Sequence, residues 1–263
     1  TPTRPPRPKA TAAADCPTGF TNVGIILNGT LRNCQLPSKI TGNLVVPARA
    51  GTIYSISGRT DVGDDRGADP ANPIAGAQQG VLTIEPGVRI FGSAGLDYIN
   101  VTRGSQIFAE GTSTQPIIFT SRQNIEGTTG ADSIGQWGGL VISGRAPIAS
   151  CPAGTTPPNI NCVATFEGGV ALYGGNSPND NSGRLRYVQV RYAGFEIQPN
   201  RELNGITFNG VGAGTTLEYV QVHNGSDDGI EFFGGTVNMK RVVVTGADDD
   251  SVDTDTGWRG GIQ

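Results

Sequence analysis

Residues 217–235 read LEYVQVHNGSDDGIEFFGG and residues 239–257 read MKRVVVTGADDDSVDTDTG, so one pattern occurs twice with an offset of 22 residues. Aligned positions hold residues of the same kind: Leu217 matches Met239, and Val222 matches Val244. Self-similarity at a fixed period of roughly 20 to 25 residues is typical of solenoids, in which each repeat buries its apolar face only against its neighbours.

Each copy contains two short runs in which apolar residues alternate with other residues, as in Val220-Gln221-Val222. Alternation of this kind places successive side chains on opposite faces of a β-strand. Glycine and aspartate occupy the junctions, and neither copy shows the 3.6-residue period of a helix. The repeat therefore predicts an all-β solenoid, a parallel β-helix with roughly 22 residues per coil and roughly eight to ten coils in the chain.

Two shorter phrases extend this pattern through the sequence. A phrase of the form Gly-apolar-x-apolar-x-Gly occurs at residues 139–144, 169–174, 205–210 and 229–234. A second phrase, an apolar residue followed by x-x-Val-x-Val, begins at Leu185, Leu217 and Met239. Because glycines permit tight corners, each glycine-bracketed phrase is predicted to be a short strand that faces the interior.

The same reading divides the chain into three parts. A basic, proline-rich arm is predicted over residues 1–15, a disulfide-pinned N-terminal cap over 16–39, and the β-helix over 40–263. Long loops are predicted to interrupt the coils at residues 58–80, 122–136, 149–165 and 175–183. Loops on one side of a solenoid commonly form its binding surface, so function is expected there.

Composition narrows the function classes. Forty glycines, 17 prolines and a charged fraction of 16% suit short strands joined by tight turns. The net charge of −4 argues against a nucleic-acid partner. No run of 18 apolar residues occurs, so no membrane-spanning helix is expected. The sequence starts at Thr1, and we expect either a processed mature chain or part of a longer one.

Four cysteines form two close pairs in the sequence, Cys16 with Cys34 and Cys151 with Cys162. Each pair flanks a loop, so two local disulfides in a secreted protein are expected, although four cysteines permit three pairings and four free thiols are the alternative. A zinc site is not expected, because Cys-x-x-Cys is absent and His223 is the single histidine.

Several segments resemble a known group of proteins. They are LTIEPGVRIFG (82–92), INVTRGSQIFAEG (99–111), QPIIFTS (115–121), GQWGGLVISGRAPI (135–148) and DDSVDTDTGWRG (249–260). These segments resemble secreted bacterial right-handed parallel β-helix proteins of the pectate-lyase-like superfold, in particular a group of surface or extracellular proteins of Gram-negative bacteria. The resemblance implies a right-handed β-helix outside the cell. It does not by itself imply one activity, because this fold carries many functions.

An acidic cluster is the strongest candidate site. It consists of Asp227, Asp228 and Glu231 and their counterparts Asp249, Asp250 and Asp253. Equivalent positions in stacked coils lie about 5 Å apart, so the carboxylates are expected to form a ladder. A calcium ion is one explanation, since carboxylate oxygens are its preferred ligands. Glycosidase-type acid and base residues are another, and aspartates that cap turns through backbone N–H groups are the third.

Two further groups of side chains could contact a polysaccharide. Arg184, Arg186, Arg191 and Arg201 include candidates for the base of a lyase, and a solvated face is the alternative. Trp137, Trp258, Tyr173, Tyr187, Tyr192 and Tyr219 could form a sugar-stacking strip, and internal stacking is the alternative.

The ends of the sequence carry opposite charges. Arg4, Arg7 and Lys9 make the arm basic, whereas residues 217–263 contain nine acids and three bases. A head-to-tail contact between copies of this chain is therefore predicted, with Asp248, Asp255 and Trp258 as its acidic and aromatic side. We expect an extracellular, non-enzymatic structural or adhesive protein that forms surface filaments. A polysaccharide-acting lyase or hydrolase and a carbohydrate-binding accessory protein remain the alternatives, with Ca²⁺ as the possible cofactor.

Overall fold

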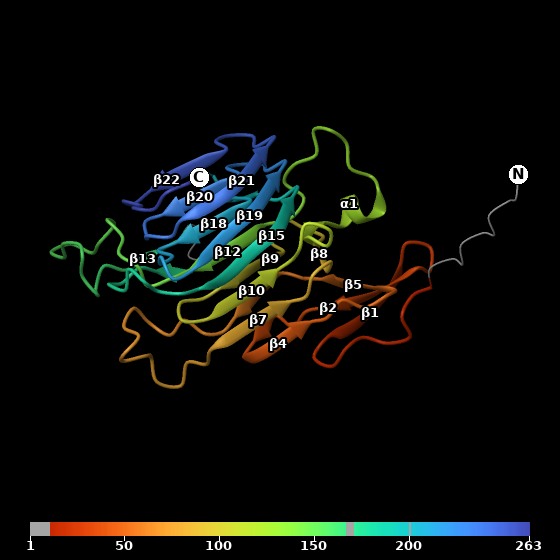
Figure 1. Ribbon diagram of the computed structural model, residues 1–263, viewed down its shortest axis with the longest axis horizontal. Helices are drawn as coiled ribbons and strands as arrows, with labels where there is room; N and C mark the ends of the chain where they lie inside the picture. Colours follow the sequence, from red (N-terminus) through yellow and green to blue (C-terminus); the bar gives the residue numbers. More distant parts are fainter. Residues whose placement is uncertain (1–10, 167–170, 200) are drawn as a thin grey trace, which may run out of the picture.

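The computed structural model describes residues 11–166, 171–199 and 201–263. The largest sheet, sheet A, contains half of the described strands and runs along the stacked coils (Figure 1). Its 11 strands are β1 (Thr21–Ile26), β2 (Leu31–Gln35), β4 (Gly42–Val46), β5 (Thr52–Ser55), β7 (Gly80–Ile84), β8 (Arg89–Gly92), β10 (Gln106–Glu110), β11 (Ile117–Ser121), β15 (Gly183–Arg191), β19 (Thr216–His223) and β21 (Met239–Thr245).

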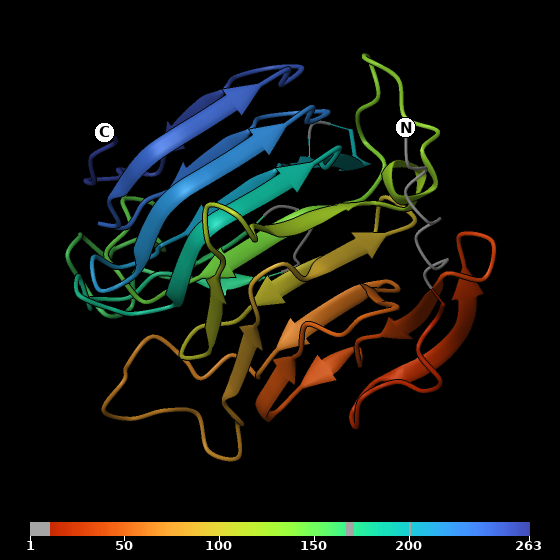
Figure 2. The ribbon, with the colours of Figure 1, turned by 45° about the vertical axis from the view of Figure 1, so that its right-hand side comes forward.

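Sheet B faces sheet A and is parallel throughout. Its seven strands are β3 (Lys39–Ile40), β6 (Arg59–Val62), β9 (Tyr98–Val101), β12 (Gly139–Ser143), β18 (Ile206–Asn209), β20 (Ile230–Phe233) and β22 (Val252–Asp255). From β18 to β22 the chain alternates strictly between the two sheets, and Figure 2 shows the resulting laps stacked from the N-terminal strands upward. The predicted parallel β-helix is confirmed.

Vertical rows of apolar side chains form the core. Leu185, Leu217 and Met239 are direct neighbours on adjacent strands of sheet A, and all three are buried. Ile142, Phe208 and Phe232 form the matching row on sheet B, with the two phenylalanine rings stacked at 5.1 Å. Full burial of one such side chain contributes roughly 1.5–3 kcal/mol to folding, so the rows hold successive coils together.

A sharp corner divides the upper strands of sheet A into two faces. Tyr187, Tyr219 and Arg241 occupy this corner in β15, β19 and β21, with φ angles of 50°, 55° and 58°. The first half of β15 pairs with β10 and the second half pairs with β11. Below β15, therefore, two separate strands and the loop between them take the place of one bent strand.

Insertions account for the differences from the predicted coil plan. Sheet B contains seven strands in the described part of the chain, fewer than the predicted number of coils, because the segment between β12 and β15 leaves the helix. The glycine-bracketed phrase at 169–174 is described from residue 171, where β14 (Leu172–Tyr173) pairs antiparallel with β13 (Ala164–Thr165). The described part of this phrase therefore belongs to an external hairpin, contrary to the prediction of an inward strand.

The insertions pack against the outer face of sheet B. Tyr98, Val141 and Phe233 point outward from this sheet and are covered by the apolar side chains of the hairpin β13–β14 and of residues 148–166.

A second hairpin pairs β16 (Phe195–Gln198) with β17 (Arg201–Leu203). The short helix α1 (Arg122–Glu126) lies in the predicted insertion 122–136. The predicted insertion 58–80 begins with β6.

Both disulfides have the expected pairing, Cys16 with Cys34 and Cys151 with Cys162. The first joins the N-terminal segment to β2, which already pairs in parallel with β5, so parallel pairing starts within the segment predicted as a cap. The second closes the loop that precedes β13. Among the described residues, no helix has the length and apolar character needed to cross a membrane.

Candidate functional site

A pocket lined by charged and polar side chains lies on the outer face of sheet B, at its lower strands. Lys39, Asp61 and Asn100 are direct neighbours on β3, β6 and β9. Their sequence neighbours Ile40 and Val62 are buried in the core. Alternation along each strand therefore turns the three polar side chains outward, into the pocket.

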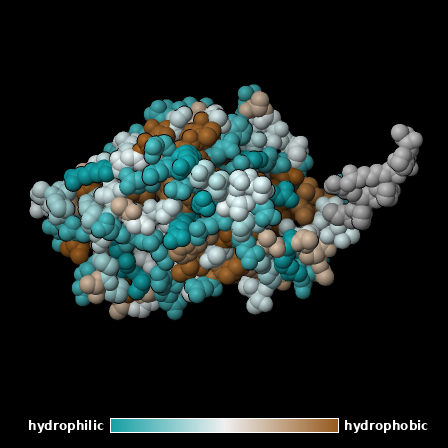
Figure 3. All heavy atoms as spheres, viewed as in Figure 1, coloured by the Kyte–Doolittle hydropathy of each residue, from teal (hydrophilic) through white to brown (hydrophobic). Residues whose placement is uncertain are grey.

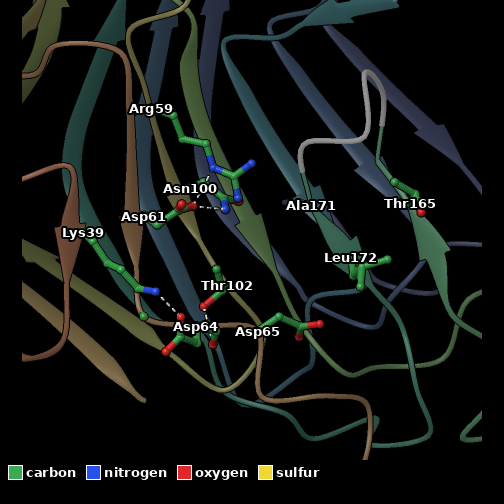
Figure 4. A pocket seen from close by; sticks show the side chains of 11 residues that line it. Lys39, Arg59, Asp61, Asp64, Asp65, Asn100, Thr102, Thr165, Ala171 and Leu172 are labelled. Carbon is green, nitrogen blue, oxygen red and sulfur yellow. Dashed lines mark hydrogen bonds and ion pairs between the residues drawn. The ribbon is translucent and has the colours of Figure 1, made fainter. Parts of the chain in front are cut away.

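The hairpin β13–β14 forms the opposite wall of this pocket, which has a volume of about 490 Å³. Figure 4 shows Thr165 and Leu172 facing the polar side chains of sheet B across the opening. The loop that follows β6 contributes Asp64 and Asp65 at one end. We call this site the sheet B pocket. It exists because the insertion folds back over the sheet at this height.

Charges in the pocket are paired. The Nε of Arg59 lies 2.7 Å from Oδ1 of Asp61, which also accepts a hydrogen bond from Nδ2 of Asn100 at 2.6 Å. Lys39 forms an ion pair with Asp64. The hydrogen bond from Lys39, together with one from the backbone N–H of Gln78, holds the pKa of the Asp64 carboxyl below its usual value. The pocket is therefore densely polar and its charges compensate one another.

The loop at the end of the pocket is held by a buried arginine. Arg103 is 3% exposed and binds Asp65 through two bonds, Nε to Oδ1 at 2.7 Å and Nη2 to Oδ2 at 2.6 Å. Its Nη1 also donates to the carbonyl of Gly174. Since Gly174 follows β14, this one guanidinium connects the loop to the base of the hairpin. The two walls are thereby fixed relative to each other.

One polar atom of Asn100 is unpaired within the described part of the chain. The side chain of Asn100 is fully buried within the protein, and its Oδ1 has no hydrogen-bond partner among the described residues. Buried polar atoms are rarely left unpaired, because the loss of hydration is costly. Protein atoms enclose this oxygen, so the group that Asn100 contributes to the site is its Nδ2, which holds Asp61.

The acidic ladder lies elsewhere, beside the upper strands of sheet B. Carboxylate oxygens of Asp227, Asp228 and Asp249 lie within 4.8 Å of one another, and so do those of Asp228, Glu231 and Asp253. Asp250 is not in either group, but its backbone N–H donates to Oδ1 of Asp228 at 2.9 Å. Five of the six predicted calcium ligands therefore converge, and one predicted turn cap is present as well. Calcium binding stays a prediction.

Burial affects one of these acids strongly. It raises the pKa of Asp228 to about 6, and the carboxylates of Asp253, Asp249 and Asp250 add to this effect. The hydrogen bond from Asp250 opposes it. A carboxyl group with this pKa changes its charge between mildly acidic and neutral pH.

Three of the six residues predicted for assembly fall within the described part of the chain. Arg4, Arg7 and Lys9 lie outside the described residues, and Asp248 and Asp255 are exposed. The ring of Trp258 stacks on Phe232 at 4.6 Å, and its Nε1 donates to the carbonyl of Val237. Trp258 therefore covers the upper end of the core.

Sequence reasoning missed the sheet B pocket. The sequence pattern places Lys39 in the predicted cap, and it places Arg59, Asp61 and Asp64 in the predicted loop 58–80. One signal was present: RTDV at residues 59–62 and YINV at residues 98–101 share a polar residue followed by an inward valine. The 39 residues that separate Asp61 from Asn100 hid this match, because they exceed the 22-residue period.

Comparison with protein families identifies the fold class. Residues 72–263 match the model of the pectate-lyase-like β-helix domain. This match covers most of the chain, and the chain therefore belongs to the pectate-lyase-like β-helix family. Comparisons with curated proteins and with solved structures gave no match.

Proposed function

We propose that this chain is an extracellular, non-enzymatic carbohydrate-binding protein with an adhesive role, and that the sheet B pocket is its saccharide site. The observation that carries the proposal is the row formed by Lys39, Asp61 and Asn100, which lines a pocket of about 490 Å³. This row places a cation, a carboxylate and an amide on three successive strands of a rigid sheet.

Sugar hydroxyl groups both donate and accept hydrogen bonds, so a saccharide site needs donors and acceptors side by side. The pocket offers the Lys39 ammonium, the Arg59 guanidinium and the Asp61 carboxylate within one small area. Leu172 adds an apolar surface on the opposite wall, against which the C–H face of a sugar ring can pack. The closely spaced pairs keep these groups in place before the ligand arrives, which reduces the cost of binding.

The pairing also argues against glycosidase chemistry in this pocket. A glycosidase needs one carboxyl group that is protonated near neutral pH, as the general acid. The hydrogen bond from Lys39 lowers the pKa of the Asp64 carboxyl, which is the opposite of what a general acid needs. Asp61 and Asp65 are each held in an ion pair with an arginine.

Two disulfides and the lack of a spanning helix in the described residues are compatible with a protein outside the cell. The bacterial cell surface remains part of the proposal. Assembly into filaments is also part of the proposal. The basic residues predicted to take part in it, Arg4, Arg7 and Lys9, lie outside the described residues.

A binding screen tests the proposed function. The purified, disulfide-intact protein is titrated with a panel of neutral and acidic oligosaccharides, and bound ligands are measured by calorimetry. The variant Arg59→Gln is expected to weaken binding at least tenfold, because it removes both the cation and the orientation of Asp61. Arg122→Gln, which alters an exposed pair on α1, is the matched control and is expected to bind as the unmodified protein does.

Two outcomes count against the proposal. The first is that no oligosaccharide in the panel binds, and the second is that Arg59→Gln binds every oligosaccharide of the panel as well as Arg122→Gln does. Release of shortened or unsaturated sugars during the titration would favour the enzymatic alternative instead.

A further inference from the structure

A second groove runs along the corner of sheet A. It has a volume of about 220 Å³, and we call it the corner groove. Its lining consists chiefly of Thr112, Ser113, Pro116, Tyr187, Gln189, Tyr219, Gln221, Arg241 and Val243. These residues belong to the other sheet from the sheet B pocket, so the two sites do not share side chains.

One wall of the groove is a ladder of planar groups. The rings of Tyr187 and Tyr219 are stacked, with their centroids 4.3 Å apart and an interplanar angle of 12°. The guanidinium of Arg241 lies 4.8 Å from the centroid of the Tyr219 ring and continues the stack. The ladder follows the direction in which the coils are stacked, because its members occupy equivalent positions in β15, β19 and β21. It therefore presents a row of ring edges to the groove.

The backbone at these positions is unusual for such large side chains. All three residues have positive φ, a conformation that glycine and asparagine adopt far more easily than tyrosine or arginine. At the next corner of the same coils, the β15 coil has Tyr192 with φ 59°, whereas the other two coils have the easier residues, Asn224 with φ 56° and Gly246 with φ 67°. Corner geometry alone therefore does not require tyrosine or arginine. Strained backbone of this kind is concentrated at functional sites.

The opposite wall offers hydrogen bonds and an apolar patch. Gln189, Gln221 and Val243 are neighbours in register, one residue beyond the inward-facing valines of the same strands. The side chain of Gln189 is oriented by a hydrogen bond from Arg191. Val243 is 52% exposed, and the surface in Figure 3 shows hydrophobic atoms near β21 on a mostly hydrophilic face. The loop with Thr112 and Pro116 closes the lower end.

The charge at the groove is positive although the protein as a whole is acidic. Arg241 forms no ion pair with a carboxylate among the residues that the structure describes. Arg186 lies over the Tyr187 ring at 5.2 Å, and its own pairing with Glu218 is long, at 3.9 Å. An exposed guanidinium that stacks on a ring but has no carboxylate partner is a ready site for a carboxylate, which it can bind through two parallel hydrogen bonds.

We propose that the corner groove binds a carboxylate-bearing saccharide. The Arg241 guanidinium holds the carboxylate, the amides of Gln189 and Gln221 bind hydroxyl groups, and the sugar C–H face packs against Val243 and the tyrosine edges. The groove is smaller than common ligand pockets of roughly 300–1,000 Å³. One sugar residue is therefore seated in it, and the rest of the chain extends along the outer surface.

The test uses hyaluronan tetrasaccharide, which carries glucuronate, and chitotetraose as the neutral counterpart. Calorimetric titration of the purified protein is expected to detect the acidic probe and to give at least tenfold weaker binding of the neutral one. Tyr219→Asn and Arg241→Asn are the informative variants, because asparagine retains the backbone conformation of the corner while the planar group is removed. Each is expected to weaken binding of the acidic probe at least tenfold with little change in melting temperature.

Arg59→Gln separates this site from the sheet B pocket. It is expected to leave binding at the corner groove unchanged, so loss of binding in Arg59→Gln alone would assign the acidic saccharide to the other site and overturn this proposal. Absence of binding to the unmodified protein would also overturn it. So would equal binding by Tyr219→Asn, Arg241→Asn and the unmodified protein.

Discussion

Asp228 accepts a hydrogen bond at 2.9 Å from the backbone N–H of Asp250, which occupies the equivalent position one coil further on. This bond links two successive coils at the turns that precede β20 and β22 of sheet B. It also holds the Asp228 carboxyl in a place where burial disfavours its charged form. The same residue is therefore a turn cap and the most perturbed acid of the ladder.

The pH dependence of stability follows from Asp228. Its pKa is about 6 in the folded protein and near 3.8 in the unfolded chain, so the folded state binds more protons between these values. The contribution of this group to the free energy of unfolding is therefore highest at low pH and falls as the pH rises from about 4 to 6. Asp228→Asn is expected to remove this loss and to stabilise the protein at pH 8 by on the order of 2 kcal/mol at most.

The measurement is denaturant unfolding in a chelating buffer at pH 4 and pH 8. Asp132→Asn, in the loop after α1, is the control for loss of one negative charge. A stability difference between Asp228→Asn and the unmodified protein that does not grow with pH would contradict the assignment.

If the acidic ladder binds calcium, added Ca²⁺ is expected to stabilise the folded protein. An ion shared by Asp228, Glu231 and Asp253 would raise the melting temperature in millimolar Ca²⁺ relative to chelator. At a concentration one hundred times the dissociation constant, the gain is about 2.7 kcal/mol. Asp228→Asn is expected to lose this gain, whereas Asp132→Asn keeps it. Identical melting curves of the unmodified protein with calcium and with chelator would exclude such a site.

The core row of sheet B gives a stability prediction. Phe232 is fully buried and stacks between Phe208 and Trp258, at 5.1 Å and 4.6 Å. Phe232→Ala is expected to lower the free energy of unfolding by about 3–5 kcal/mol. Val243→Ala, on the exposed side of sheet A, is expected to change it by less than about 0.5 kcal/mol. Guanidinium unfolding curves of both variants provide the comparison, and similar losses in the two would contradict this arrangement of the core.

Self-association has a direct test as well. If the arm over residues 1–15 joins copies head to tail, its removal is expected to abolish fibres seen by negative-stain microscopy and to lower the sedimentation coefficient. The charge-neutral variant, with Arg4, Arg7 and Lys9 changed to glutamine, separates the effect of charge from that of chain length. An unmodified protein that sediments as a monomer at high concentration would rule out the filament.

The fold was predictable because side-chain direction repeats with the coil. A 22-residue offset between Leu217 and Met239 implies that they are vertical neighbours, and the structure confirms it. The acidic ladder was predictable for the same reason, since Asp228 and Asp250 share that offset.

The sheet B pocket was not predictable from this rule. Its residues come from coils with long insertions, so Asp61 and Asn100 are neighbours despite a separation of 39 residues. The opposite wall of the pocket is the hairpin β13–β14, and β14 lies in the glycine-bracketed phrase at 169–174, which has the same pattern as the inward-facing strands. The sequence pattern does not distinguish the two cases, because tertiary packing decides that β14 lies outside the β-helix.

Of the six aromatic residues predicted as a possible sugar-stacking strip, only Tyr187 and Tyr219 stack on each other at the surface, whereas Trp137, Tyr173 and Tyr192 are buried. The corner conformation of Tyr187 and Tyr219 was not predictable, because tyrosine rarely adopts positive φ.

The double pairing of β15 has a mechanical consequence. This one strand is bonded to β10 along its first half and to β11 along its second half. A force that peels laps from the top would meet one bent strand at a time until it reached β15. There the rupture breaks the bonds to two different strands together, and the lap below no longer consists of one bent strand. The lower coils should therefore yield as a separate event in a pulling experiment.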